Sequence, residues 1–372
     1  MKVLYLFVLV SITSLFCINV SAWDQTGHMI AARIAYLDLT AKTKADITPL
    51  LKKGTTKPLP IQIKAKDDSF LICAAAPWAD SIKYAGKWNK PEAEKFYADA
   101  HTMHSKILFD DTSKVTPEKA VDDEVKRTGN DNSIKVIESC IKTLTSKTSD
   151  ENYKAIALRF LIHLVADQTQ PLHVAYIFLK DKKGDLISPN GADMIRFSKP
   201  SDIIARYAGK EEKAYYLHGY WDLAGGLYNS VPMGNKILYM NKKKEAYIDA
   251  QAEKYSSDFK SMKKQLTENC SAHDWAVDTY KTAEKYAASP DLFKNSKIES
   301  KGKLIINTPD KKYQKIAQET SEMQLYKAGI RLGSLLNALF NPENSPKAYL
   351  NYVNQIKSDS KVLTLEQMKP LY

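Results

Sequence analysis

Cysteine, glycine and proline are all scarce in this chain. Its 372 residues include 4 Cys, 14 Gly and 15 Pro. These counts exclude a collagen-like protein, a disulfide-rich scaffold and a low-complexity chain. Apolar residues make up 44% and charged residues 26% of the sequence. This is the balance of an ordinary globular protein that can bury a sizeable core.

Long apolar runs are lacking as well, except at the N-terminus. Lys2 precedes a largely apolar stretch from Val3 to Phe16, and small residues close the segment at Val20-Ser21-Ala22. A positive start, an apolar middle and small residues before a cut are the layout of a secretory signal. We therefore expect residues 1–22 to be a signal peptide that is cleaved after Ala22. A retained N-terminal anchor is the alternative.

The mature chain, residues 23–372, is expected to be secreted or periplasmic. No later stretch approaches the ~18 to 20 apolar residues that a membrane span requires. Basic residues outnumber acidic ones, 54 to 43, for a formal net charge of +11. This charge favours polyanionic partners such as nucleic acid or an anionic membrane surface, although Lys-rich surfaces also serve solubility alone. No stable protein partner is implied.

Three cysteines remain after the expected cut, so at most one internal disulfide can form. Cys73 lies in the apolar run 71–76 and is expected to be buried as a thiol. The candidate disulfide is therefore Cys140 with Cys270. The sequence contains no paired-cysteine motif for a metal.

The spacing of apolar residues predicts helices through most of the mature chain. Residues 52–68 and 109–132 are expected to be loops, and residues 180–200 an irregular excursion with at most one small hairpin. We find no tandem repeat and no change of composition that marks a domain boundary, so we predict an all-α protein with a single, mainly helical domain over residues 23–372. The expected helical segments are 29–51, with a second helix opening at Thr40, 69–84, 134–144, 152–165, 240–264, 273–287 and 313–340.

Histidine is also rare, yet two of the 7 His recur in the same local pattern. His163 and Asp167 stand four residues apart in an apolar helical segment, and His218 and Asp222 repeat that spacing, so each pair shares one helix face. A single pair of this kind is more often a simple hydrogen-bonded pair. Two pairs favour a metal site, because burying His163 and Asp167 without partners would cost several kcal/mol. A His and carboxylate set without cysteine suits zinc.

The expected new N-terminus offers further ligands. A free α-amine has a pKa near 8, and the amine and carbonyl oxygen of Trp23 can form a five-membered chelate. His28 is close enough in the sequence to join it.

Four groups of residues together carry a resemblance to a known family. The sequence resembles the zinc-dependent class I nucleases, which are the single-strand-preferring nucleases and 3'-nucleotidases of fungi, plants, protists and bacteria. These enzymes are distantly related to the zinc-dependent bacterial phospholipase C. The resemblance runs from Trp23 to about Phe340. Its motifs are Trp23 with Gly27-His28, Pro77-Trp78-Ala79-Asp80 with Gly86-Lys87-Trp88, Ala157 to His163 with Gln170-Pro171-Leu172-His173, and Leu217-His218 with Trp221-Asp222.

The resemblance implies a site with three Zn²⁺ ions. One zinc would take the amine and carbonyl of Trp23 together with His28. A second zinc would take Asp80, His163 and a histidine near residue 104. Asp167 would bridge these two ions.

The third zinc of the resemblance would be held by His173, His218 and Asp222. Two histidines are candidates for the open position on the second zinc, His101 and His104. The family's pattern of an apolar residue before this histidine fits His104 better.

Departures from the family pattern concern the substrate rather than the metals. The family usually has Arg three residues after the ligand Asp80, and this chain has Lys83 there. Lysine can offset phosphate charge but cannot form a bidentate fork. The aromatic and acidic residues that hold a base in fungal members are not apparent at 105–107, and residues 190–192 replace a Gly-Gly-Asn segment. The sequence therefore indicates the hydrolytic chemistry more strongly than it indicates which bases the enzyme prefers.

We predict a secreted trinuclear zinc phosphodiesterase that cleaves single-stranded DNA and RNA to 5'-phosphorylated products. The sequence leaves open whether the enzyme also has 3'-nucleotidase activity. Asp80 and Lys83 are the predicted catalytic residues. A zinc-dependent phospholipase C is one alternative, although that relative typically has Glu where this chain has Asp222. A non-catalytic zinc-binding surface protein is the other. His273-Asp274-Trp275 is expected to serve packing or helix capping.

Overall fold

The computed structural model describes residues 23–53, 63–80, 105–108, 115–180, 186–187, 195–207, 210–228, 240–298 and 304–368. Helices dominate these residues, and the strands are short. The predicted mainly helical fold is therefore confirmed. The expectations for residues 1–22 and for Lys83, His101 and His104 lie outside the described residues.

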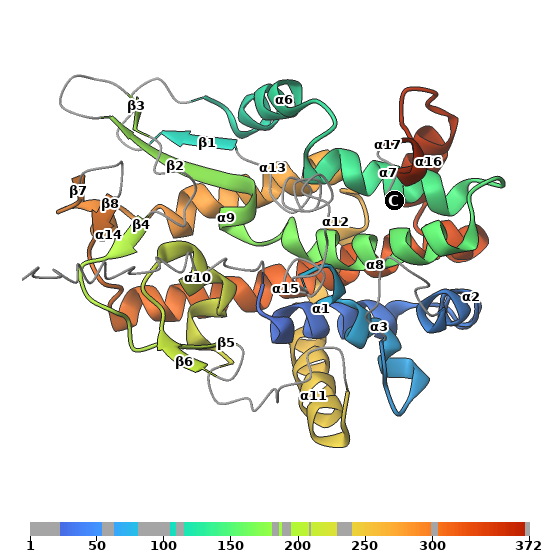
Figure 1. The fold of residues 1–372 in the computed structure, drawn as a ribbon, viewed down its shortest axis with the longest axis horizontal. Helices are drawn as coiled ribbons and strands as arrows, with labels where there is room; N and C mark the ends of the chain where they lie inside the picture. The colour runs from blue at the N-terminus through green and yellow to red at the C-terminus, as the bar shows by residue number, and fades with distance from the viewer. Residues whose placement is uncertain are drawn as a thin grey trace, which may run out of the picture.

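The described part of the N-terminal half of the chain consists mainly of helices, with three short strands (Figure 1). In chain order the elements are α1 (Gln25–Asp38), α2 (Ala41–Lys52), the 3-10 turn η1 (Asp68–Phe70), α3 (Leu71–Ala75), β1 (Ser105–Leu108), α6 (Pro117–Thr128), α7 (Ser133–Thr145), α8 (Glu151–Asp167), α9 (Pro171–Val174), β2 (Ala175–Lys180) and β3 (Leu186–Ile187).

The C-terminal half begins with short strands and continues with helices. Its elements are β4 (Ile195–Phe197), β5 (Ile204–Tyr207), β6 (Lys210–Lys213), α10 (Leu217–Asp222), η3 (Ala224–Gly226), α11 (Lys242–Asp258), η4 (Lys260–Met262), α12 (Lys263–Leu266), α13 (Ala272–Thr282), the π-helical turn η5 (Ala283–Ala287), α14 (Pro290–Phe293), β7 (Lys297–Ile298), β8 (Leu304–Ile306), α15 (Lys311–Phe340), η7 (Pro342–Asn344), α16 (Lys347–Ser358) and α17 (Leu365–Met368).

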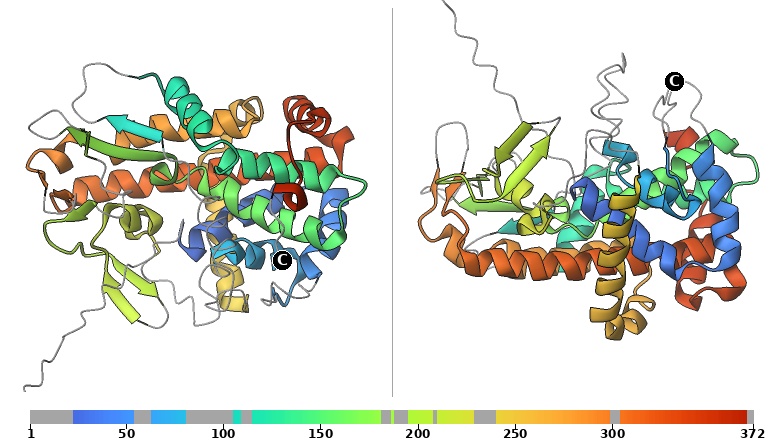
Figure 2. Two further views of the ribbon diagram at one scale, coloured as in Figure 1. Left: turned by 45° about the horizontal axis from the view of Figure 1, so that its top comes forward. Right: turned by 90° about the horizontal axis from the view of Figure 1, so that it is seen from below.

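Helix α15 is the longest element and runs along the long axis of the molecule (Figure 2, right). Asp310 caps its first turn by accepting a hydrogen bond from the backbone N–H of Tyr313, and Pro342 follows its C-terminal cap. Helices α1, α2, α8 and α16 pack against it. At its closest approach to α1 stands Gly329, where a side-chain Cβ would overlap with Ile34. Helix α1, which carries His28, is therefore packed closely against α15.

Helix α8 lies at the centre of the core. Every residue from Ala155 to Asp167 is buried, and the helix packs against α2, α3, α7 and α15. Asp150 caps its N-terminus by accepting from the backbone N–H of Asn152. Polar side chains on this helix therefore have to find their partners inside the protein.

In the part of the chain that the structure describes, three small sheets lie among the helices. Strand β2 pairs in parallel with β1 and antiparallel with β3, so the hairpin allowed at residues 180–200 is present at its beginning. Strand β4 instead pairs in parallel with the distant β8, which pairs antiparallel with β7, and β5 pairs with β6. The sequence did not indicate these strands, because they are too short to show alternation.

The predicted loop at residues 109–132 is wrong in its second half, where α6 forms. Thr116 caps this helix, Pro117 occupies its first turn and Gly129 ends it. Ala120 and Val121 are buried. The capping signals were readable, but the polar composition concealed the narrow apolar face.

The single helix predicted over residues 69–84 is interrupted. After η1, α3 ends at Ala75, and a turn at Ala76-Pro77 precedes a further helical start at residues 78–80. Proline has no backbone N–H and cannot continue the helical hydrogen bonds. The break matters for the site, because it redirects the chain before Asp80.

The predicted disulfide between Cys140 and Cys270 is also wrong. Both residues are free thiols, as is Cys73. Cys73 and Cys140 are fully buried, and burial raises the pKa of the Cys73 thiol to about 12. These two cysteines act as small apolar core residues.

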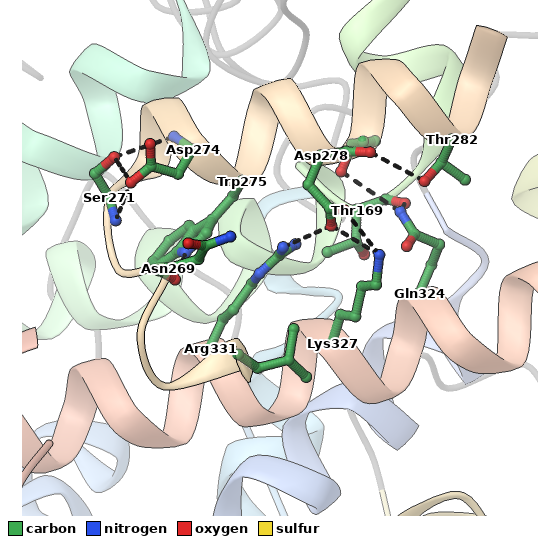
Figure 3. Close-up of polar contacts among 12 residues, drawn as sticks. Thr169, Asn269, Ser271, Asp274, Trp275, Asp278, Thr282, Gln324, Lys327 and Arg331 are labelled. Carbon is green, nitrogen blue, oxygen red and sulfur yellow. Dashed lines mark hydrogen bonds and ion pairs between the residues drawn. The ribbon is translucent and has the colours of Figure 1, made fainter. Parts of the chain in front are cut away.

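The segment at His273 serves capping and packing, as predicted. Ser271 and Asp274 form a capping box at the start of α13, and the Trp275 side chain is buried (Figure 3). One turn later, Asp278 accepts hydrogen bonds from Lys327 and Arg331 on α15. These contacts join α13 to α15.

Among the described helices, none is both long enough and apolar enough to cross a membrane.

Candidate metal centre

The first group of converging ligand atoms comes from three separate elements. His28 lies on α1, Asp80 follows the turn after α3, and His163 lies on α8. All three are buried, and one ligand atom from each lies within 4.8 Å of the others. His28 Nε2 is 4.0 Å from Asp80 Oδ2, and His163 Nε2 is 3.8 Å from Asp80 Oδ1. The structure thus brings together residues that are far apart in the sequence.

Asp167 faces both histidines of this group with different oxygens. Its Oδ1 is 3.2 Å from His28 Nε2, and its Oδ2 is 3.0 Å from His163 Nε2. The two imidazole rings stack with their centroids 4.2 Å apart. A carboxylate between two such rings has the arrangement of a bridging ligand.

The second group consists of His173 on α9 with His218 and Asp222 on α10. His173 Nε2 and His218 Nε2 lie 3.7 Å and 3.6 Å from Asp222 Oδ1. The two rings meet edge to face. The four-residue spacing of His218 and Asp222 thus places both on one side of α10, as predicted.

Local structure fixes the ring of His163. Its Nδ1 lies 2.8 Å from the carbonyl oxygen of Ala76, and a carbonyl can only accept, so Nδ1 donates and Nε2 faces the carboxylates. A histidine that binds metal typically donates its other N–H to a backbone carbonyl or carboxylate in this way.

The residues present fit a metal ion. Among the described residues, His28 Nδ1 and both carboxylate oxygens of Asp80 are buried and have no hydrogen-bond partner, which costs several kcal/mol unless a ligand compensates. Zinc bonds of 2.0–2.1 Å at tetrahedral angles separate neighbouring ligand atoms by about 3.3 Å. The contacts of Asp167 with the first group, 3.0 and 3.2 Å, lie just below that value, and the separations within the two groups, 3.6 to 4.0 Å, lie slightly above it.

The pKa values of the two histidines in the first group shift in opposite directions. Burial alone lowers the pKa of His163, but the charges of Asp167 and Asp80 outweigh burial and raise that pKa to about 9. Burial and the neighbouring His163 lower the pKa of His28. The pKa of Asp167 lies well below its usual value, because the two histidines outweigh the effect of burial.

Trp23 is fully buried beside the end of α8. Its indole Nε1 donates to the carbonyl oxygen of Ala166 at 3.0 Å and lies 3.2 Å from Thr169 Oγ1. The indole of Trp23 therefore contacts the residues on either side of Asp167–Gln168 in the chain.

The sequence assigned no role to three residues near the groups, although Gln170 belongs to one of the motifs of the resemblance. Thr169 contacts the Trp23 indole, Gln170 donates to Asp222, and the backbone N–H of Asp24 donates to the carbonyl oxygen of Asp222 at 2.8 Å. These contacts join segments distant along the chain, so no local pattern indicates them. The position of Thr169 and Gln170 between Asp167 and His173 was the available signal.

Comparison with known proteins identifies the class. The S1/P1 nuclease family model matches residues 23–341, which include every described residue of both groups. The chain belongs to the S1/P1 nuclease family, whose members are metal-dependent hydrolases acting on nucleic acids. The match ends at the close of α15, so α16 and α17 lie beyond it.

A curated relative agrees with this assignment. The chain is 24% identical to Endonuclease 2 of Arabidopsis thaliana over 334 residues, which cover 87% of this chain and 92% of the plant protein. The similarity therefore extends over nearly the whole of both proteins.

Proposed function

We propose that the chain is exported, cut after Ala22, and acts as a trinuclear zinc nuclease formed by one domain over residues 23–372. The observation that carries the proposal is the pair of buried histidine and carboxylate groups on α1, α8, α9, α10 and the segment 78–80. The start of the family match at Trp23 supports the proposed cut. The resulting location is secreted or periplasmic.

The proposed ligand assignment follows the two groups. The first zinc takes the amine and carbonyl of Trp23 with His28, and the second takes Asp80, His163 and His104, with His101 as the alternative to His104. Asp167 bridges them, which the contact of each carboxylate oxygen with a different histidine supports.

The third zinc of the proposal is held by His173, His218 and Asp222. Zinc ions, when bound, supply the Lewis acidity that activates water for attack on phosphorus and offsets negative charge in the transition state. The protein holds the ligands in a buried environment, where such interactions are stronger than in water. Lys83 offsets charge on the phosphoryl oxygens as a point charge.

The proposed substrates are single-stranded DNA and RNA, cleaved to 5'-phosphorylated products, and the 3'-phosphates of nucleotides. The family and the name of the plant relative support an endonuclease. The net charge of +11 supports binding to a polyanion, which would weaken as salt rises.

The experiment that tests this function uses the purified mature protein on two substrates, single-stranded DNA and phosphatidylcholine, each with and without a chelator. We expect nucleotides with 5'-phosphates from the DNA, loss of this activity with chelator and its return with added zinc. Diacylglycerol from the lipid would instead identify a phospholipase C. Zinc binding without turnover on either substrate would identify a non-catalytic zinc protein.

A further inference from the structure

The turn between α8 and α9 carries a side chain that contacts a ligand of the second group. Gln170 is fully buried, and its Nε2 donates to Asp222 Oδ1 at 2.5 Å. The two residues lie 52 positions apart in the chain, and helices α9 and α10, which bring them together, are neighbours (Figure 1). Gln170 therefore contacts the carboxylate oxygen that both histidines of the group face.

A second hydrogen bond fixes which end of the Gln170 amide faces Asp222. The backbone N–H of Leu172 donates to Gln170 Oε1. A backbone N–H can only donate, so the oxygen of the amide must point toward α9 and the NH₂ group toward the carboxylate. The orientation is set by the backbone and does not depend on the protonation of Asp222.

We propose that Gln170 is the positioning residue for Asp222 in the second group, which holds the third zinc of the proposed site. This inference rests on the proposed function, because it assumes that the group binds zinc. Ligating carboxylates are held by hydrogen bonds from residues outside the ligand set, and these bonds orient the ligand. The NH₂ group of Gln170 supplies such a bond and stabilises the ionised form of Asp222 that coordination requires.

The location of Asp222 explains why it needs this support. It is the last residue of α10, a helix of 6 residues whose N-terminus has no side-chain cap. The ends of helices are their least ordered parts. Gln170 instead lies only three residues before His173, on the turn that follows the buried helix α8. One buried turn thus carries a ligand of the group and the side chain that orients a second ligand.

Two substitutions at one position separate positioning from a merely structural role. Gln170→Leu removes both hydrogen bonds at similar side-chain size. Gln170→Glu keeps an acceptor for the Leu172 N–H but offers no N–H to Asp222. Gln168→Leu is the matched control, because Gln168 is buried in the same turn and donates to Ser133 rather than to a ligand.

The measurement is zinc content per chain after equilibration with buffers of graded free zinc, together with the unfolding temperature in chelator. We expect both Gln170 variants to lose one zinc ion per chain at roughly 10- to 100-fold higher free zinc than the wild type. The Gln168→Leu variant should retain wild-type zinc binding. In chelator, Gln170→Leu and Gln168→Leu should have similar unfolding temperatures.

Three results would decide against the inference or its basis. Wild-type zinc binding by either Gln170 variant would overturn it, because the amide would then serve only the α9 turn. An equal loss of zinc in Gln168→Leu would overturn it too, since any change in this turn would have the same effect. A wild-type protein that binds no zinc would overturn the proposed function itself, and this outcome is read before any variant is compared.

Discussion

His163 and Asp167 lie one turn apart on α8, with His163 Nε2 3.0 Å from Asp167 Oδ2. Both are fully buried in a helix whose neighbouring residues are mostly apolar. Such a pair is costly to bury for stability alone. In the proposed site the pair holds metal, and metal binding contributes to folding as well as to chemistry.

The first prediction tests this pair. We expect His163→Ala and Asp167→Asn each to abolish nearly all nuclease activity, to lower zinc content and to reduce the unfolding temperature. His273→Ala is the control, because His273 pairs with Asp122 in a partly exposed contact outside both groups. It should leave zinc content and activity unchanged. Full activity with normal zinc content in either α8 variant would refute the assignment.

The second prediction concerns Lys83. A cation that stabilises charge formed in the transition state affects turnover more than binding of the substrate. We therefore expect Lys83→Ala to lower kcat on single-stranded DNA more than it raises KM, and Lys83→Arg to retain activity. Steady-state kinetics with zinc content measured in parallel provide the check. Unchanged kcat in Lys83→Ala would remove this residue from the mechanism.

The third prediction concerns acid stability through Asp278. Burial alone raises the pKa of this carboxyl, but Arg331 and Lys327 outweigh burial and lower it (Figure 3). A carboxyl with a lowered folded-state pKa stabilises the fold above its unfolded pKa of about 3.9, and this contribution is lost as pH falls through the folded-state value.

We expect Asp278→Asn to lower the free energy of unfolding at pH 7 by about 3 kcal/mol, because Lys327 and Arg331 are left without their carboxylate. The difference from the wild type should shrink below pH 4. Urea denaturation at pH 7 and pH 3.5 measures both values. Asp123→Asn removes a well-exposed pair with Lys119 and serves as the control. A difference for Asp278→Asn that does not change with pH would contradict the electrostatic explanation.

The fourth prediction concerns the contact between α1 and α15. A Cβ at position 329 would overlap with Cβ and Cγ2 of Ile34 and lie 2.9 Å from the carbonyl oxygen of Ala31. We expect Gly329→Ala to destabilise the protein by about 1–3 kcal/mol. Gly333→Ala, whose nearest contact is 3.1 Å, should cost less. Chemical denaturation of both variants tests this order, and equal stability would show that the helices shift apart freely.

Much of the fold and of the site could be predicted from local features of the sequence. Contacts between segments that are distant in the sequence could not. Helix α15 and the His163–Asp167 pair follow from spacings of three and four residues, which the sequence displays directly. Helix α6 was missed because polar composition outweighed its capping residues. The bond from Gln170 to Asp222 depends on the packing of α9 against α10, which periodicity does not encode.

The last prediction concerns Trp23, whose indole is fixed by Ala166 and Thr169 at the end of α8. In the proposed site its α-amine is a zinc ligand, and that amine exists only after cleavage following Ala22. An amide nitrogen has its lone pair delocalised into the carbonyl and cannot coordinate zinc at neutral pH. A chain with one additional residue before Trp23 would keep the indole contacts and lose the amine.

We therefore expect a form that retains an initial Met before Trp23 to bind less zinc and to lose most of its turnover. The exported form, cut after Ala22, should be fully active. The His173, His218 and Asp222 group does not use the amine as a ligand and should still load with zinc in both forms. Intact mass, zinc content and a single-stranded DNA assay make the comparison. Equal activity of the two forms would show that Trp23 serves packing alone and that the first zinc is held by other ligands.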